Sequence, residues 1–158
     1  DHKPLNYRRG IMKNRKRGFS LVELLIVLAV IAALIATITP VALNAIRKAQ
    51  ATKVVQNMKT LASSFENYVY VNGDTPDAFN LIGRDIDDSK YAIVYTETST
   101  GGAYTVTILS AESANPGTVA EISADLNSGS YTITTEDETL NSLTDDITFW
   151  YQYSFVNY

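Results

Sequence analysis

The first half of the chain holds an unusually long apolar stretch. Residues 24–36 are uninterrupted aliphatic side chains and alanine, and the apolar character extends over residues 19–39. The wider stretch is broken only by Ser20, Glu23, Thr37 and Thr39. As an α-helix rising about 1.5 Å per residue, it would be roughly 30 Å long, the thickness of a bilayer core. This pattern predicts a membrane-crossing helix over residues 19–40.

After Pro40 the pattern becomes amphipathic, with apolar residues recurring every three or four positions. These residues are Val54, Val55, Met58, Leu61, Ala62, Phe65, Tyr68 and Val69. Asn72-Gly73 predicts the helix end, because Gly is the usual residue after a helix C-terminus. We therefore expect one long helix, with a transmembrane half over 19–40 and an amphipathic half over 41–72. At about 1.5 Å per residue it would span roughly 80 Å, too long for a domain of this size to bury.

Beyond Gly73 the helical period disappears, and β-branched and aromatic residues predict antiparallel strands. The expected strands are residues 91–98, 103–111, 130–136 and 147–156, with a weaker one at 118–123. Thr100-Gly101-Gly102 predicts a hairpin turn after the first strand, and Asn127-Ser128-Gly129 a turn before residue 130. The fold class is therefore α+β, with a sheet over residues 73–158 packed on the amphipathic half-helix.

Charge is distributed very unevenly along the chain. Seven of the 13 Lys and Arg residues precede Phe19, against one acid, Asp1. Residues 19–158 therefore carry six basic and 16 acidic side chains, a balance of −10. An acidic surface repels nucleic acid and anionic lipid, so direct nucleic-acid binding is not expected.

The residue inventory argues against enzymatic chemistry. The chain has no cysteine, which excludes disulfides, thiol nucleophiles and thiolate metal sites. Its one histidine, His2, precedes the apolar stretch, and no nucleophile motif follows it. No catalytic residue and no metal site is therefore predicted.

A basic cluster at residues 13–17 precedes the apolar span. Positive charge stays on the cytoplasmic side of a membrane, which predicts that the rest of the chain lies outside. A cleaved secretory signal peptide also begins with positive charge, but its apolar region is only about 7 to 15 residues long and ends in small residues. The sequences IAAL and LIAT are poor sites of that kind, so the signal peptide is the less favoured alternative.

Glu23 is the only charged residue between Gly18 and Arg47, and it has two interpretations. In the first, Ser20 and Glu23 form an S-x-x-E capping box at the start of the helix. In the second, cleavage before Phe19 creates a charged α-amino group, which pairs with the Glu23 carboxylate of a neighbouring copy. Glu23 would then fix the axial register of packed helices, because a shifted copy leaves a charge unpaired in apolar surroundings.

The stretch KRGFSLVELLIVLAVIAALIATITP resembles the prepilin signature of type IV pilins and the related pseudopilins. In that signature a short basic leader ends in glycine, here Gly18, and Phe19 would be the first mature residue. Glu23 would be the fifth mature residue and Pro40 the twenty-second. The signature covers residues 13–40, and an amphipathic half-helix followed by a sheet is compatible with the pilin-like fold.

The resemblance implies a processing pathway. A membrane-embedded aspartyl prepilin peptidase would cut between Gly18 and Phe19, removing the leader (residues 1–18), and would methylate the amine of Phe19. Glu23 would serve methylation or subunit docking. Pro40 would mark where the helix kinks or locally melts, although an ordinary interruption at the membrane edge uses the same missing N–H.

The resemblance also implies a function and partners. The chain would be the structural subunit of a type IV pilus, a homo-oligomeric helical filament outside the cell, made from a single-pass membrane precursor with a cytoplasmic N-terminus. An inner-membrane assembly platform and a cytoplasmic ATPase would drive assembly, since the chain has no phosphate-binding G-x-x-x-x-G-K-[ST] loop. Alternatives are a type II secretion pseudopilin, a competence pilin and, from another class, an N-anchored membrane-bound binding module.

Three features depart from the common pattern or leave a choice open. Met12 would start a compact leader, MKNRKRG, so residues 1–11 are interpreted as a misassigned start or as added, non-native residues. Many related pilins close the C-terminal region with a disulfide, whereas here strand pairing and aromatic residues must hold residues 147–158. The acidic clusters at 85–88, 136–138 and 145–146 are candidate Ca²⁺ ligands, but none matches an EF-hand loop, and solvated loops are the favoured interpretation.

The C-terminal segment is rich in aromatic residues. They are Phe149, Trp150, Tyr151, Tyr153, Phe155 and Tyr158. Their alternation favours a strand that contributes to the core, with a carbohydrate-binding platform as the less favoured alternative.

Overall fold

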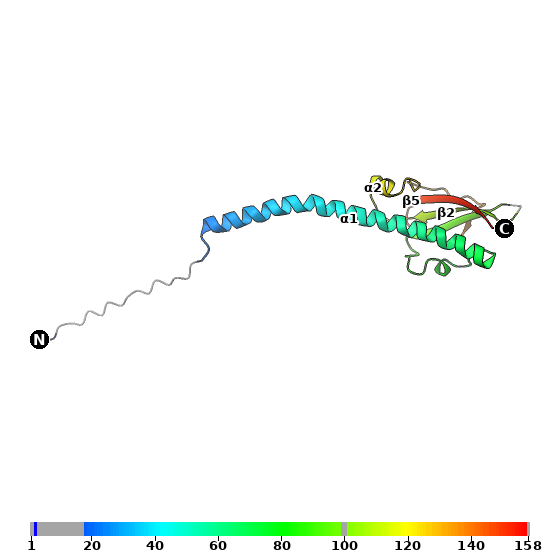
Figure 1. Cartoon of the computed structure of the whole chain (residues 1–158), viewed down its shortest axis with the longest axis horizontal. Helices are drawn as coiled ribbons and strands as arrows, with labels where there is room; N and C mark the ends of the chain where they lie inside the picture. Colours follow the sequence, from blue (N-terminus) through cyan, green and yellow to red (C-terminus); the bar gives the residue numbers. More distant parts are fainter. Residues whose placement is uncertain (1, 3–17, 99–100, 158) are drawn as a thin grey trace. The chain divides into compact units, whose positions relative to one another are not determined.

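The computed structural model describes residues 2, 18–98 and 101–157 (Figure 1). It divides into two units, residues 1–41 and 42–158, which are described separately. The first contains the apolar part of helix α1, and the second, called the head below, contains the rest of α1 and the sheet. A long N-terminal helix followed by an antiparallel sheet is the expected α+β arrangement.

Helix α1 runs from Leu21 to Asn72 without a break and includes Pro40. It ends where the sequence predicts, because Gly73 adopts a left-handed φ of 72° and donates its N–H to the Val69 carbonyl at 2.8 Å. In the head, one stripe of the helix is buried: Ala51, Val54, Val55, Met58, Leu61, Ala62, Phe65 and Val69. The predicted amphipathic stripe is thus confirmed, with Tyr68 packed at its margin.

The described residues form a five-stranded antiparallel sheet with the order β3-β5-β2-β1-β4. Its three long strands are β1 (Tyr91–Glu97), β2 (Ala103–Ser110) and β5 (Phe149–Val156). Strand β2 is central and pairs with β5 along its whole length and with β1 from Tyr104 to Ser110. The edges are the two-residue strands β3 (Asn127–Ser128) and β4 (Glu138–Thr139).

The β1–β2 hairpin requires glycine at its turn. Gly101 and Gly102 have φ values of 76° and 79°, which other residues rarely adopt. A Cβ added to Gly102 would also collide with the Asn157 carbonyl oxygen, next to the bond from the Asn157 N–H to the Gly102 carbonyl. Both glycines of the predicted turn are therefore confirmed in it, while Thr100 lies outside the described residues.

The two faces of the sheet bury different sets of side chains. On the inner face, Phe65 of α1 packs 5.2 Å from the ring of Tyr95 and 6.3 Å from that of Phe155, between ring centroids. The Tyr153 hydroxyl donates a 2.7 Å hydrogen bond to the Ala62 carbonyl, which joins β5 directly to α1. The outer face is covered by a loop, residues 129–148. This loop packs Tyr131, Leu143 and Ile147, together with Trp150 of β5, against Ala92, Val94 and Leu109.

The weak strand expected at residues 118–123 is wrong, because these residues belong to helix α2 (Pro116–Ile122). The Asn115 side chain accepts a 3.1 Å hydrogen bond from the Thr118 N–H, and Pro116 occupies the first turn. Asn as N-cap followed by Pro is a helix-start signal. The sequence analysis treated Asn115-Pro116-Gly117 only as a breaker.

The strand expected at residues 130–136 is also wrong. The segment has no strand partner, although the short strands β3 and β4 lie just before and after it. The Tyr131 ring packs instead on Trp150, 5.3 Å away, and Thr134 donates its backbone N–H to Asp137 in a turn. Of the turn expected before this segment, Asn127 and Ser128 form β3, and only Gly129, with φ 108°, leaves the strand.

The Lys59–Asp125 ion pair gives a testable pH dependence. Hydrogen bonds from the Lys59 ammonium and the Ser123 hydroxyl lower the pKa of Asp125 to about 2. An unfolded Asp titrates near pH ~3.9, so this stabilisation is complete above pH ~4 and is lost as the pH falls from ~4 through ~2. Its size is below about 1 kcal/mol, because the Asp125 side chain is 57% exposed.

We expect Lys59→Met to raise the pKa of Asp125 towards ~3.9, measured by NMR titration of its carboxyl carbon in the full chain. Lys90→Met, which breaks the separate pair between Lys90 and Asp145, is the matched control and should leave the pKa of Asp125 low. An unchanged Asp125 pKa in the Lys59 variant would show that the ion pair is not its cause.

Candidate processing and assembly site

The four residues at the start of α1 form a small exposed site in the first unit. Gly18, Phe19 and Ser20 precede the helix, and Glu23 lies in its first turn. Together they line a shallow hollow of about 400 Å³, and the Phe19 side chain is 81% exposed. The peptide bond between Gly18 and Phe19 is therefore next to the only acid of the apolar stretch.

Ser20 and Glu23 form both hydrogen bonds of a capping box. The Glu23 backbone N–H donates to the Ser20 hydroxyl oxygen at 3.1 Å, and the Ser20 N–H donates to the Glu23 carboxylate at 3.4 Å. The Leu24 N–H then donates to the Ser20 carbonyl at 3.1 Å, which begins the regular helix. The capping-box interpretation is thus confirmed for the chain by itself.

The capping box does not saturate the Glu23 carboxylate. A carboxylate can accept about four hydrogen bonds, and among the described residues Glu23 accepts one long bond and forms no ion pair. Its charge therefore remains available to a cation from another molecule. Pairing with the Phe19 amine of a second copy stays a prediction.

Packing among the described residues gives no reason for glycine at position 18. A Cβ built on Gly18 would meet nothing within 4 Å, and its φ lies outside the left-handed region. A larger side chain would therefore leave the described fold unchanged.

The helix continues through Pro40 in the isolated chain. Pro40 has no N–H, so the Ala36 carbonyl loses its usual i+4 donor within the helix. In the same turns, the hydroxyls of Thr37 and Thr39 donate to the carbonyls of Ala33 and Ile35, at 2.8 Å and 2.7 Å. The hydroxyl groups of the two threonines therefore have hydrogen-bond partners within the apolar helix. The backbone hydrogen bond that this part of the helix lacks is the one to the Ala36 carbonyl, in the turn before Pro40.

The apolar part of α1 is exposed. Its most apolar 18-residue window has a mean hydropathy of 2.9, and none of its residues is buried. By length and composition, this stretch is compatible with a single-pass membrane anchor.

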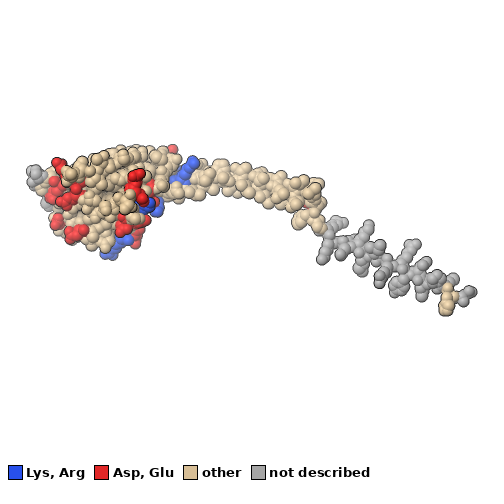
Figure 2. All heavy atoms as spheres, turned by 180° about the vertical axis from the view of Figure 1, so that it is seen from behind, with Lys and Arg blue, Asp and Glu red and all other residues tan. Residues whose placement is uncertain are grey.

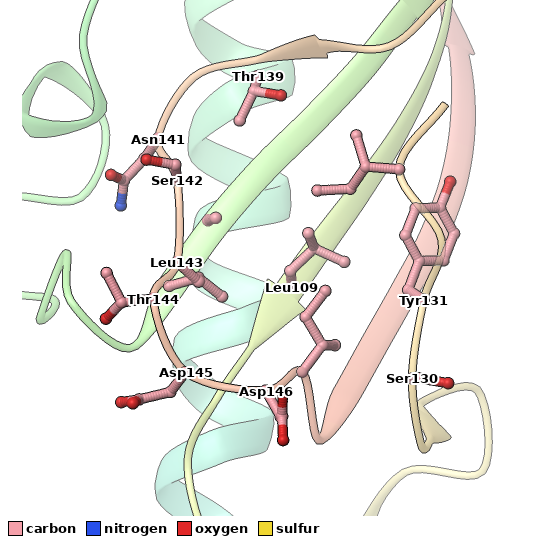
Figure 3. Close-up of a pocket in the computed structure, with 13 residues that line it drawn as sticks. Leu109, Ser130, Tyr131, Thr139, Asn141, Ser142, Leu143, Thr144, Asp145 and Asp146 are labelled. Atoms are coloured by element: carbon pink, nitrogen blue, oxygen red, sulfur yellow. The ribbon is translucent and has the colours of Figure 1, made fainter. Parts of the chain in front are cut away.

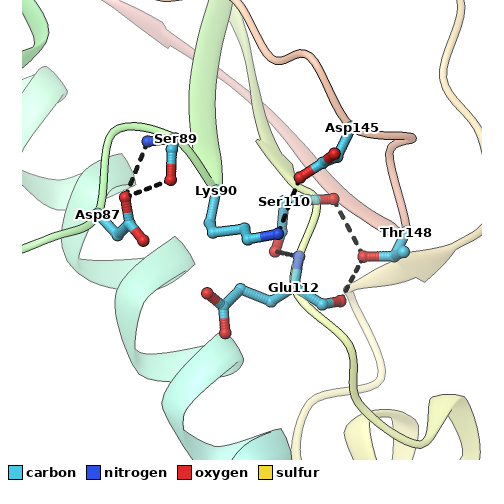
Figure 4. A network of polar contacts seen from close by, with 7 residues as sticks. All are labelled: Asp87, Ser89, Lys90, Ser110, Glu112, Asp145 and Thr148. Atoms are coloured by element: carbon cyan, nitrogen blue, oxygen red, sulfur yellow. Dashed lines mark hydrogen bonds and ion pairs between the residues drawn. The ribbon is translucent and has the colours of Figure 1, made fainter.

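The acidic clusters do not assemble a metal site in the described part of the chain. Asp87 accepts hydrogen bonds from the backbone N–H and hydroxyl of Ser89, which lower its pKa (Figure 4). Asp145 pairs with Lys90 at 2.8 Å and raises the pKa of that ammonium group. Glu138 accepts a 3.0 Å bond from the Tyr95 hydroxyl. These carboxylates thus serve local contacts of the loops, and acidic groups are spread over the surface of the head (Figure 2).

The C-terminal aromatic residues belong to the packing of strand β5. Phe149 and Phe155 are buried, Tyr151 and Tyr153 pack against the inner core, and Trp150 packs on the outer face. The core-strand interpretation is confirmed for these residues, while Tyr158 lies outside the described part.

The sequence analysis missed a cavity on the outer face of the sheet. It lies between the two arms of the 129–148 loop, the first arm being residues 130–137 and the second residues 140–148. Tyr131 and Ile133, two apolar residues at alternate positions, line this cavity, but their alternating pattern was interpreted as part of a strand.

Comparison with known families matches residues 13–39 to the prokaryotic N-terminal methylation motif. This motif is the class III signal of type IV pilins and pseudopilins, so the resemblance found in the sequence is confirmed for these residues. The match ends just before Pro40 and leaves the head outside it. Neither the curated proteins nor the solved structures include a significant match to the chain.

The capping box predicts different effects for its two members. Ser20→Ala removes the acceptor of the Glu23 N–H and should speed hydrogen exchange of that amide about fivefold, since a lost cap costs about 1 kcal/mol. Glu23→Gln should leave this exchange nearly unchanged, because a capping box accepts Gln. Exchange is measured by NMR on the full chain, with Ser64→Ala in the middle of α1 as control. Equal protection of the Glu23 amide in wild type and Ser20→Ala would show that the cap does not form.

Proposed function

With the methylation motif at residues 13–39 as premise, we propose that this chain is the structural subunit of a type IV pilus. The motif supports a type IV pilin-like or pseudopilin protein. The observation that carries the proposal further is an exposed apolar half-helix that holds a single carboxylate, Glu23, which is the fifth residue after the predicted cleavage point.

Processing would begin at the bond between Gly18 and Phe19. A prepilin peptidase would cut there and methylate the new amine of Phe19, after the apolar helix has anchored the precursor with its N-terminus in the cytoplasm. Since no contact with a described residue requires glycine at position 18, we assign that requirement to the peptidase. Cleavage would remove the basic leader, which otherwise holds this end of the helix at the cytoplasmic surface.

Assembly would then use the same helix as the core of a filament. Each copy would pack its apolar half against neighbours, through a heterologous contact that repeats into an open helical polymer. The Glu23 carboxylate would pair with the Phe19 amine of an adjacent copy. Pro40 would allow a local change in the helix, because the turn before it already lacks one hydrogen bond. The heads would cover the outside of an extracellular filament.

The remaining partners follow from what the chain lacks. It has no nucleotide-binding loop, so an inner-membrane assembly platform and a cytoplasmic ATPase would supply the work of extension. The chain itself is proposed to have no enzymatic activity and no cofactor. A pseudopilin of type II secretion would share the processing steps and differ in the length of the assembly, and electron microscopy of shed filaments distinguishes the two.

Mass spectrometry of the mature N-terminus tests the processing step. In cells that contain a prepilin peptidase, we expect a chain that begins with N-methylated Phe19. Gly18→Val should abolish cleavage and leave the fold of the head unchanged, because the added Cβ meets none of the described residues within 4 Å. An intact bond after Gly18 in the wild type, or cleavage near Ala33 or Ala36, would contradict the proposal and favour an N-anchored module or a secreted protein.

A second experiment tests the charge of Glu23 in assembly. Glu23→Gln keeps the cap but removes the negative charge, so the variant should be cleaved yet fail to form filaments at wild-type levels. Glu66→Gln, in the head part of α1, is the matched control and should assemble normally. The measurement is the ratio of sheared filament to total subunit. Wild-type assembly of Glu23→Gln would rule out pairing with the Phe19 amine.

A further inference from the structure

A cavity of about 760 Å³ lies on the outer face of the sheet, opposite α1 (Figure 3). Ala92 of β1 and Leu109 of β2 form its floor. The two arms of the 129–148 loop form its walls, with apolar side chains from both arms: Tyr131, Ile133, Leu143 and Ile147. Its volume is in the range of small-ligand pockets. The apolar side chains alternate with polar ones around the lining: Ser130, Thr139, Asn141, Ser142, Thr144, Asp145 and Asp146.

Specific contacts hold each arm of this loop against the sheet and its adjoining residues. On the first arm, the Tyr131 hydroxyl oxygen accepts a 3.3 Å hydrogen bond from Thr107 of β2. On the second arm, Asn141 donates to the Tyr91 carbonyl at 2.7 Å. Asp145 of the same arm pairs with Lys90, and the hydroxyl of Thr148, where the arm ends, donates to the carbonyls of Ser110 and Glu112 at 3.1 Å and 2.6 Å (Figure 4). The cavity is therefore part of the folded head rather than a gap between loose segments.

The first arm has unused backbone hydrogen-bonding groups. Within the described part of the chain, no hydrogen bond involves the backbone N–H or C=O groups of residues 130–133. The same residues have the alternating, β-branched and aromatic pattern of a strand. A strand-type segment with free backbone groups is a template for pairing with another extended chain.

The described residues of the cavity leave one charge unpaired, and this charge is negative. Among the described residues that line it, the charged ones are Asp145 and Asp146, and only Asp145 has a basic partner. Glu136 and Asp137 follow closely on the first arm. A cationic group would gain from this potential and an anionic one would be repelled.

We propose that this cavity binds an extended, basic peptide segment of a partner protein. Residues 130–133 pair with the backbone of the segment, as in strand addition. Aliphatic side chains on one face of the segment occupy the apolar part of the cavity, and a flanking Lys or Arg lies beside Asp146. The site belongs to the head alone, so it does not depend on the proposed filament.

The test uses the full chain in phosphatidylcholine nanodiscs, whose zwitterionic lipid does not attract a basic peptide. The probe is an acetylated and amidated Lys-Ile-Lys-Val-Lys peptide, followed by NMR of backbone amides and methyl groups. We expect shifts at the amides of residues 130–134 and at the methyl groups of Leu143 and Ile147. The matching Glu-Ile-Glu-Val-Glu peptide should not bind at the same concentration.

Two variants separate the apolar and the charged parts of the site. Ile133→Thr should raise the Kd about tenfold, and Asp146→Asn about two- to fivefold. Both residues are exposed, Ile133 by 45%, so the substitutions spare the core of the head. Ile122→Thr and Asp77→Asn change exposed residues away from the cavity and serve as matched controls with an unchanged Kd.

Four results would overturn the proposal. The first is equal binding of the basic and acidic peptides, and the second is a Kd that neither Ile133→Thr nor Asp146→Asn changes. The third is a shift of the same amides on raising the protein concentration without peptide, which would identify a second copy as the occupant. The fourth concerns peptides that are N-methylated at every second residue, either the odd-numbered or the even-numbered ones. Only one of these two patterns blocks the N–H groups that face residues 130–133, and that peptide should not bind. Tight binding of both methylated peptides would exclude strand addition.

Discussion

An apolar helix that its own chain leaves exposed is the constraint on which the rest of this structure depends. More than ten large apolar side chains between Phe19 and Val41 are about half or more exposed. Burying each of them is worth about 1.5 to 3 kcal/mol, so the stretch as a whole favours lipid or packed copies by on the order of 20 kcal/mol. Apart from the Ala36 carbonyl, which lacks its donor because of Pro40, the interior of this helical stretch satisfies its own backbone polarity, and its side chains therefore decide its surroundings.

The same magnitudes explain how Glu23 is tolerated. A charged group at the centre of a membrane helix costs about 2.5 to 3.5 kcal/mol on insertion scales, far less than the apolar side chains supply. Glu23 lies in the first turn instead, where the helix dipole and the Ser20 cap favour a carboxylate. The free-energy cost of the Glu23 carboxylate is therefore too small to prevent membrane insertion. It is large enough that, if helices of several copies packed without water, an axial register that leaves this charge unpaired would be disfavoured. The capping box and a charge pair between copies are compatible, because the first uses only one long bond to the carboxylate.

The parts of the fold that the sequence predicts are those in which local pattern and tertiary contact agree. The stripe from Val54 to Val69 faces the inner core, and β1, β2 and β5 are long strands paired along most of their length. Residues 130–136 have an equally good strand pattern but no neighbour with which to pair, and a pattern cannot reveal whether a partner exists. The sequence contained a local signal for helix α2, because Asn115 is its N-cap and Pro116 lies in its first turn. The Pro116-Gly117 pair was interpreted instead as a break before a strand.

The candidate site divides in the same way. Gly18, Phe19, Glu23 and Pro40 could be located from the sequence, because the motif is contiguous and its chemistry depends on spacing along one helix. The outer cavity could not, because it depends on where the 129–148 loop crosses the sheet and on contacts over long sequence distances, such as Thr107 to Tyr131 and Lys90 to Asp145.

This difference has a physical consequence for the head. The inner face of the sheet packs against the apolar stripe of α1. Among the described residues, every buried polar side-chain atom has a hydrogen-bond partner. The outer face buries only a small cluster, Ala92, Val94 and Leu109, beneath a loop held by a few polar contacts. Substitutions in that loop therefore disturb fewer buried contacts than substitutions in the inner core, and the outer face is where this head can change its surface chemistry while α1 and the inner core stay the same.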